Sequence, residues 1–121
     1  MRLLIVDDSA IMRQAIEKYL GKYELEIVGT AGDGKTALEI FEKTNPDLVT
    51  MDITMPKMDG LTCLDRMLKI KPNTRILVIS ALKDPSTGMR ALRLGAHSFL
   101  TKPFTAEQLH EEIEIICREL A

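Results

Sequence analysis

The sequence predicts an α/β fold, in which one doubly wound, five-stranded parallel sheet is flanked by five helices. Five short apolar runs, each closed by turn residues or polar side chains, have the pattern of buried parallel strands. A helical pattern follows each run, so that strand and helix alternate roughly every 25 residues. No linker or low-complexity stretch interrupts this alternation. We therefore expect a single domain over residues 1–121.

The expected strands are short, and four of the five lead directly into polar residues. The runs end on or before Asp7, Asp52, Ser80 and Lys102, whereas the second run ends near Gly29 and Thr30. The predicted strands cover residues 3–6, 26–30, 48–52, 76–79 and 98–101.

Local signals mark the ends of the first two helices. Ser9 or Asp8 is suited to cap the first helix, and Gly21 ends it. The second helix opens at residues 33–34 (Asp-Gly) and stops at residues 45–46 (Asn-Pro). The expected apolar face of the first helix consists of Ile11, Ala15, Ile16, Tyr19 and Leu20.

The other three helices carry comparable signals. The third helix begins after Gly60 and is closed by Pro72. Asp84 is expected to cap the fourth helix, with Pro85 in its first position. The sequence from Thr105 to Gln108 predicts a capping box for the last helix. Its apolar face is expected to contain Leu109, Ile113, Ile116 and Leu120.

Composition excludes several classes of protein. A net charge of −2 gives no support for direct binding of nucleic acid, which usually needs a basic patch. No stretch approaches the roughly 18 apolar residues of a membrane span, and acidic residues follow the first strand too early for a secretory signal. We therefore expect a cytoplasmic protein without membrane insertion. Cys63 and Cys117 lack metal-ligand spacing and are expected to be free thiols.

Three Asp, one hydroxyl and one Lys are predicted to meet at one edge of the sheet. The carboxyl ends of parallel strands share an edge, and ligands of open α/β sheets bind there. Each group alone has an ordinary explanation as a helix cap, a turn residue or the exit of a strand. Their joint placement after four different strands favours a functional site at Asp7, Asp8, Asp52, Ser80 and Lys102.

The chemistry of this group favours a magnesium ion and a phosphoryl group. Carboxylates at close range disfavour each other's ionisation, and a divalent cation relieves a charge of about −3. A carboxylate such as Asp52 can form an aspartyl phosphate, while Lys102 neutralises charge on the transferring oxygens. Gly32 and Gly34 lack the rest of a nucleotide-binding fingerprint, so the phosphoryl donor is not expected to bind here as a nucleotide.

Five pieces of the sequence together resemble the receiver domains of response regulators, and among them the single-domain, CheY-like chemotaxis regulators. They are residues 6–9 (VDDS), 51–56 (MDITMP) with 59–60 (DG), 80–81 (SA), 95–96 (GA) and 102–104 (KPF). The resemblance covers the whole chain and implies a flavodoxin-like sheet of order 2-1-3-4-5.

The resemblance also implies roles for individual residues. Asp52 corresponds to the phosphoacceptor, and Asp7 and Asp8 to the acidic pair that holds Mg²⁺ together with Asp52. The backbone carbonyl of Thr54 corresponds to a further metal ligand. Ser80 and Lys102 match the hydroxyl and the ammonium that contact the phosphoryl group. In the family the peptide bond between Lys102 and Pro103 is cis.

Phe99 stands where the family has its aromatic switch residue, although many chemotaxis members have Tyr there. In this interpretation the Ser80 hydroxyl follows a phosphoryl oxygen, its loop shifts, and the ring moves into the space left. The alternative is that Phe99 is an ordinary core residue. His97 is expected to be a surface residue rather than a ligand.

The resemblance implies a phosphorylation-activated response regulator of a two-component phosphorelay. A histidine kinase would phosphorylate Asp52 with Mg²⁺ as cofactor, and the chain would catalyse only its own phosphorylation and dephosphorylation. Output would pass through the fourth helix, fifth strand and fifth helix to a protein partner, with the flagellar motor switch as one candidate.

Two alternatives remain at this stage. The chain is also compatible with the receiver fragment of a longer regulator that has a DNA-binding or enzymatic output. A Mg²⁺-dependent phosphohydrolase is disfavoured, because Ile53 and Thr54 supply no acid after Asp52 and no insertion is long enough for a cap.

Overall fold

The computed structural model describes residues 1–53, 60–81 and 85–120. Five strands and five helices alternate along them. The strands are β1 (Arg2–Val6), β2 (Glu26–Ala31), β3 (Leu48–Asp52), β4 (Arg75–Ser80) and β5 (Ser98–Thr101). The helices are α1 (Ala10–Tyr19), α2 (Gly34–Thr44), α3 (Gly60–Ile70), α4 (Pro85–Leu94) and α5 (Ala106–Leu120).

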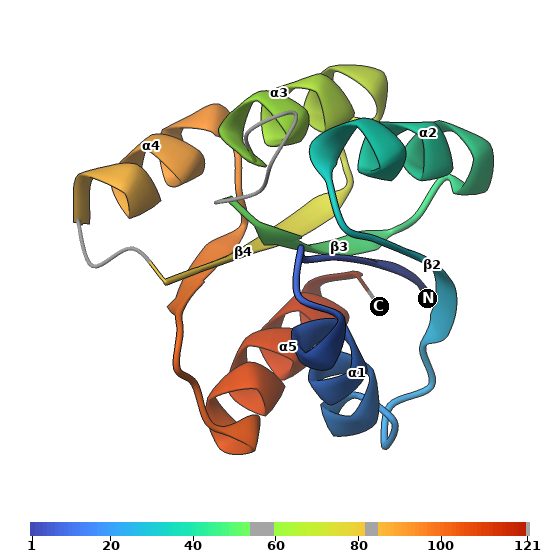
Figure 1. The fold of residues 1–121 in the computed structure, drawn as a ribbon, viewed down its shortest axis with the longest axis vertical. Helices are drawn as coiled ribbons and strands as arrows, with labels where there is room; N and C mark the ends of the chain where they lie inside the picture. The colour runs from blue at the N-terminus through green and yellow to red at the C-terminus, as the bar shows by residue number, and fades with distance from the viewer. Residues whose placement is uncertain (54–59, 82–84, 121) are drawn as a thin grey trace.

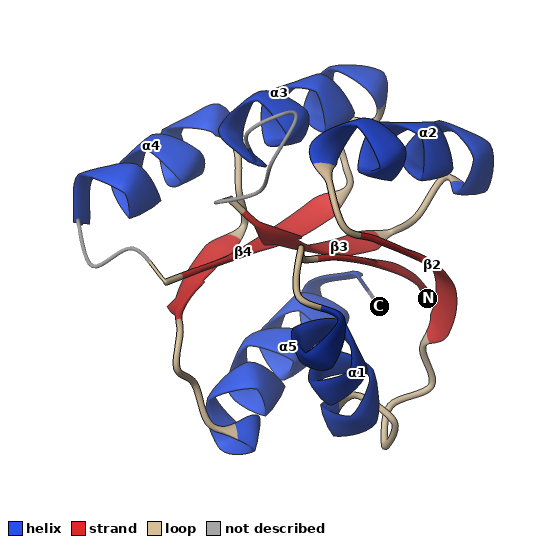
Figure 2. Ribbon diagram, viewed as in Figure 1, coloured by secondary structure: helices blue, strands red, loops and turns tan. Residues whose placement is uncertain are grey.

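The sheet is parallel and has the order β2-β1-β3-β4-β5, which confirms the predicted fold class and strand order. Helices α2, α3 and α4 cover one face of the sheet, and α1 and α5 cover the other (Figure 1). Figure 2 shows the sheet as the middle of three layers. Because both faces are covered, the central strands are buried on both sides.

Two hydrophobic cores lie on the two sides of the sheet, and alternate strand residues enter each. The first core, under α2, α3 and α4, contains Leu4, Val6, Val49, Met51, Ile76 and Val78 from the strands. The second, under α1 and α5, contains Leu3, Ile5, Leu48, Leu77, Ile79 and Leu100. The apolar runs are continuous in sequence because both sets must be apolar.

Most predicted helix ends are confirmed. The Ser9 side chain accepts a hydrogen bond from the amide of Met12, and the cap residue of α2, Asp33, accepts one from Thr36. Asn45 ends α2 with a left-handed backbone at φ 51°. Thr105 and Gln108 form the predicted reciprocal capping box, at 2.8 and 3.1 Å. Asp84, the predicted cap of α4, lies outside the described residues.

The predicted apolar face of α1 is wrong at Ile11. Its side chain is 81% exposed, whereas Ile16 and Leu20 are buried in the second core. Ile11 and Met12 lie in the same first turn of α1, and it is Met12 that packs against the second core. Helical spacing alone did not reveal this difference.

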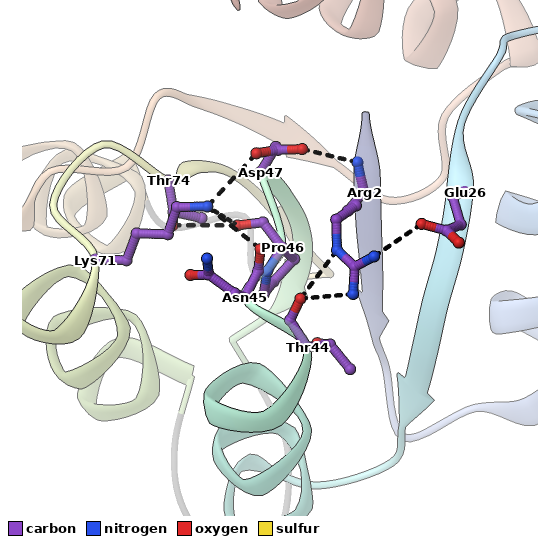
Figure 3. A network of polar contacts seen from close by, with 8 residues as sticks. All are labelled: Arg2, Glu26, Thr44, Asn45, Pro46, Asp47, Lys71 and Thr74. Carbon is purple, nitrogen blue, oxygen red and sulfur yellow. Dashed lines mark hydrogen bonds and ion pairs between the residues drawn. The ribbon is translucent and has the colours of Figure 1, made fainter.

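A network of polar contacts holds together the amino-terminal edge of the sheet (Figure 3). The Arg2 side chain donates to the carbonyl of Thr44 at 2.7 and 3.0 Å, and its backbone amide donates to Asp47 at 2.9 Å. Lys71, at the end of α3, donates to the carbonyl of Pro46 at 3.0 Å. These cations satisfy carbonyls at the end of α2 and tie it to β1, β3 and α3.

The Asp47 carboxylate is expected to stabilise the fold at neutral pH. The hydrogen bond from the Arg2 amide, and then the Lys71 ammonium, hold the Asp47 pKa below its usual 3.8 despite partial burial. A lowered pKa means that the ionised form stabilises the folded protein, and that this contribution is lost as pH falls through the folded-state pKa.

We predict that Asp47→Asn lowers the free energy of unfolding by about 1 kcal/mol at pH 7. The difference should shrink as the pH falls below 3.8, and urea unfolding at pH 7 and at acid pH measures it. Asp65→Asn is the control, because it breaks an i,i+4 ion pair with the exposed Lys69, at 3.1 Å, on the surface of α3. A loss at Asp47 that stays constant with pH would contradict this assignment.

Candidate functional site

The topology places the ends of β1 and β3 side by side. Val6 pairs with Met51 in the parallel register, so Asp7 follows β1 next to Asp52 at the end of β3. The strand order reverses between these two strands, and in open α/β sheets this is the point where ligands bind. Both carboxylates are buried, with 1% exposure for Asp7 and 2% for Asp52.

Hydrogen bonds fix the position of Asp7. One carboxylate oxygen accepts from the amide of Ser9 at 2.9 Å, and the Asp7 amide donates to the carbonyl of Ala31 at 3.0 Å. The Arg13 side chain on α1 donates to the carbonyl of Asp7 at 2.6 Å. The first turn of α1 therefore holds the backbone of Asp7 as well as its side chain.

Lys102 reaches this pair of carboxylates from the end of β5. Its ammonium lies 2.7 Å from a carboxylate oxygen of Asp7 and 3.5 Å from one of Asp52. Burial lowers the Lys102 pKa, but the hydrogen bond to Asp7 and the charges of Asp52 and Asp7 outweigh burial, so the pKa is raised. Lys102 is therefore a charged donor between two buried carboxylates.

Asp8 completes the acidic group from the solvent side. One oxygen from each of Asp7, Asp8 and Asp52 can be chosen so that all three lie within 4.8 Å of one another. Asp8 itself is exposed. Partial desolvation, together with the charges of Asp52 and Asp7, raises the pKa of Asp8 above 3.8. Desolvation is the largest cause of this raised pKa, and at Asp8 the charges of Asp52 and Asp7 outweigh the opposite charge of Lys102.

The residues present suit a hard divalent cation. Three carboxylates and one ammonium leave a formal charge of about −2, which one divalent ion balances. The donors are carboxylate oxygens, the ligand type that Mg²⁺ prefers. The further ligand expected from the sequence, the carbonyl of Thr54, lies outside the described residues.

Gly60 allows α3 to begin directly against the end of β3. A side chain at Gly60 would collide with the Cα of Ile53 and would lie 2.8 Å from the carbonyl oxygen of Asp52. The Gly60 amide also donates to the carbonyl of Ile53 at 3.3 Å. The glycine is required here by the close approach of two backbones around Asp52.

The remaining predicted site residues lie on β4 and β5. Ser80 is fully buried and ends β4, next to the strand of Asp52, and its carbonyl accepts from the Lys102 amide at 2.8 Å. The bond between Lys102 and Pro103 is cis, as predicted. Phe99 is half-buried on β5 and packs against the first core.

Sequence reasoning missed Arg13 and the surroundings of His97. Arg13 carries no sequence signal, because its bond is to a backbone carbonyl that only the folded chain brings near. His97 is partly buried rather than on the open surface, and its Nε2 lies 3.2 Å from a carboxylate oxygen of Glu119 on α5. Cys63 and Cys117 form no disulfide, as predicted, and the buried Cys63 thiol donates to the carbonyl of Gly34 at 3.6 Å.

A family model described as the response regulator receiver domain matches residues 3–114. The chain belongs to this family. As a receiver domain it is 45% identical over 112 residues to the chemotaxis protein CheY of Bacillus subtilis strain 168, with 93% of each chain covered. It is 38% identical to CheY of Thermotoga maritima, with 97% of this chain and 98% of that protein covered.

Solved structures and a multidomain relative extend the comparison. The receiver domain matches CheY of Borrelia burgdorferi, solved in a CheX-CheY-BeF3-Mg complex, with a TM-score of 0.91 and 34% identity over 96% of this chain and 88% of that one. It is also 39% identical to a protein-glutamate methylesterase/protein-glutamine glutaminase of Methylobacillus flagellatus. That match covers 99% of this chain and 35% of the enzyme.

Receiver domains are in general signalling domains rather than enzymes, and the receiver domain here is of the chemotaxis type. In the part of the receiver domain that the structure describes, no helix combines the length and the apolar character needed to cross a membrane.

We predict that Asp8→Asn stabilises the protein when divalent cations are absent. Because its pKa is raised, ionised Asp8 opposes folding above pH 3.8, and this penalty disappears as the pH falls below that value. Asp8 is exposed, so the expected gain is a few tenths of a kcal/mol, or about 1–2 °C in the unfolding temperature.

Thermal unfolding in a chelating buffer at pH 7 measures this gain. Glu17→Gln on α1 is the control, since it removes an exposed carboxylate outside the cluster and should leave the unfolding temperature unchanged. If Asp8→Asn were less stable than the parent in this buffer, Asp8 would be a stabilising helix residue rather than a repelled carboxylate.

Proposed function

We propose that this receiver domain accepts a phosphoryl group on Asp52 from a histidine kinase, with Mg²⁺ as cofactor, and that the modification changes its binding to an output protein. One observation carries the proposal: a buried carboxylate at the end of the central strand lies 3.5 Å from an ammonium and beside two further carboxylates. The likeness to the Borrelia CheY, solved with BeF3 and Mg²⁺, supports it.

The proposed phosphoryl transfer needs only groups that this chain and the histidine kinase supply. A carboxylate oxygen of Asp52 forms a new bond to phosphorus, while the bond from phosphorus to the histidine nitrogen of the kinase breaks. The nitrogen keeps the electron pair and takes up a proton. Asp52 attacks as a carboxylate and gives up no proton, so no general base is needed.

Charge neutralisation is the main task of the surrounding residues. Asp7, Asp8 and Asp52 would hold the metal ion, with the Thr54 carbonyl as a proposed further ligand. The bound ion supplies positive charge for the phosphoryl oxygens. Lys102 would exchange its contact with Asp7 for one with a phosphoryl oxygen, because its ammonium already lies between Asp7 and Asp52.

Ser80 and Phe99 are proposed to convert the modification into a change of shape. The Ser80 hydroxyl would bind a phosphoryl oxygen on Asp52, since Ser80 ends the strand next to β3. The carbonyl of Ser80 accepts from the amide of Lys102, so a displacement at Ser80 acts on the end of β5, where Phe99 also lies. The ring would then change position.

The proposed output surface lies on α4, β5 and α5. Its α4 side combines Arg93 with two exposed apolar side chains, Met89 (51% exposed) and Leu92 (42%), whereas Arg90 and Leu94 line a hollow with residues of α3. Its α5 side is acidic around Ile115, which is 45% exposed. Apolar side chains among charged ones are typical of protein-binding surfaces. The flagellar motor switch is one candidate partner, in line with the chemotaxis relatives.

We propose that residues 1–121 act as one signalling domain in the cytoplasm. The second candidate is the receiver part of a longer regulator, which the match to the receiver-length portion of a methylesterase favours. In both cases the chemistry at Asp52 is the same, and the proposals differ only in the output.

We predict that a small phosphodonor with Mg²⁺ adds one phosphoryl group to the protein, and that Asp52→Asn abolishes the addition because an amide is not a nucleophile. Intact-mass spectrometry measures the adduct, and hydroxylamine should remove it. Asp47→Asn is the matched control, because it removes a carboxylate at the opposite edge of the sheet. An adduct that persists in Asp52→Asn would show that another residue is the acceptor.

We predict that Ser80→Ala is phosphorylated on Asp52 but responds less to it, because the hydroxyl that would follow the phosphoryl oxygen is gone. NMR spectra of parent and variant, compared at equal phosphorylation, should show shift changes in β5 and α4 reduced at least twofold in the variant. Ser98→Ala is the control, since it removes a hydroxyl at the other end of β5. Full-sized shift changes in Ser80→Ala would rule out a hydroxyl-driven switch.

A further inference from the structure

Gly88 lies inside α4, where glycine is unfavourable. At an exposed position in a helix interior, glycine makes folding roughly fivefold less favourable than alanine does. A glycine that is kept inside a helix therefore usually has a packing or functional reason. Gly88 is buried, and it follows the first turn of the helix.

The aromatic ring of Phe99 explains why position 88 is a glycine. A methyl group added at Gly88 would lie 3.3 Å from each of three ring carbons, Cδ1, Cδ2 and Cε2. Equal distances to atoms on both sides of the ring place the added carbon over the ring face. Carbon atoms pack best at about 3.5–4.0 Å, so the ring occupies space that a side chain at position 88 would need.

The contact between Gly88 and Phe99 joins the two elements that lead away from the site. Helix α4 follows β4, which ends at Ser80, and Phe99 lies on β5, which delivers Lys102. Phe99 pairs with Val78, and Ser80 pairs with Thr101, so ring and hydroxyl lie on adjacent strands two residue pairs apart.

We propose that Gly88 is a positioning residue for Phe99: because it has no side chain, the ring rests face-on against α4, and this contact couples α4 to the end of β5. The coupling role rests on the proposed phosphorylation of Asp52. A side chain at position 88 pushes the ring away from α4 and so alters this contact.

A double-mutant cycle tests the contact without any phosphorylation. In a Phe99→Ala background, Gly88→Ala should raise the folding equilibrium constant about fivefold, because only the helix propensity changes. In the parent, the same change should give less than a twofold gain, or a loss, because the methyl group meets the ring. Equal gains in both backgrounds would overturn the proposal.

Arg90 provides the control for helix propensity. It lies two residues further along α4, on the opposite side of the helix, and it is exposed. The difference between Arg90→Ala and Arg90→Gly should be about fivefold whether residue 99 is Phe or Ala. A dependence on residue 99 at this position too would mean that the cycle reports on α4 as a whole, which would contradict a specific contact.

Fluorine NMR tests whether the contact between Gly88 and Phe99 couples α4 to the end of β5. The three phenylalanines, Phe41, Phe99 and Phe104, give three signals after labelling with fluorophenylalanine, and Phe99→Leu identifies the signal of Phe99. Gly88→Ala should move that signal and leave the Phe41 signal in place. Beryllofluoride with Mg²⁺ should move the Phe99 signal of the parent, and should move it at least twofold less in Gly88→Ala.

Two outcomes distinguish the coupling role of Gly88 from the proposed phosphorylation of Asp52. If Asp52 takes up a phosphoryl group but beryllofluoride leaves the Phe99 signal of the parent in place, the coupling role is wrong and the proposed chemistry stands. If Asp52 takes up none while the cycle shows coupling of residues 88 and 99, the proposed function fails and the packing role stands.

Discussion

Negative charge at the carboxyl edge of the sheet, where three carboxylates meet one ammonium, determines what the site can bind. Asp7 and Asp52 are buried side by side because β1 and β3 are neighbours, and Asp8 adds a third carboxylate. Lys102 compensates only part of this charge. Burying like charges is costly, and the raised pKa of Asp8 is the local sign of that cost. In the proposed function, a bound divalent cation relieves this cost.

The two edges of the sheet differ in how well their charged groups are compensated. At the amino-terminal edge, Arg2 and Lys71 satisfy the carbonyls at the end of α2, and Asp47 is well compensated (Figure 3). That edge needs no ligand and anchors the strands. At the carboxyl edge, in the proposed function, the polar groups bind a metal ion and a phosphoryl group.

Local patterns predicted most of the fold and the meeting of Asp7, Asp8, Asp52 and Lys102 at one edge of the sheet. Strand ends, helix caps and the capping box at Thr105 depend on residues close in sequence, so the sequence alone indicates them. Three features depended on the folded chain: the exposure of Ile11, the bond from Arg13 to the Asp7 backbone, and the place of Phe99 against Gly88. Each is a contact, or a missing contact, between elements whose packing no local pattern specifies.

The dependence of stability on Mg²⁺ concentration shows whether the carboxyl edge of the sheet binds one divalent cation. If the carboxyl edge lacks one divalent cation, the free energy of unfolding should rise with Mg²⁺ concentration as expected for one ion bound to the folded protein only. Urea unfolding of the parent at increasing Mg²⁺, with NaCl added to hold ionic strength constant, measures this. Stability that is unchanged by Mg²⁺ over the same range would contradict the account, because the carboxylates would then be balanced without a metal.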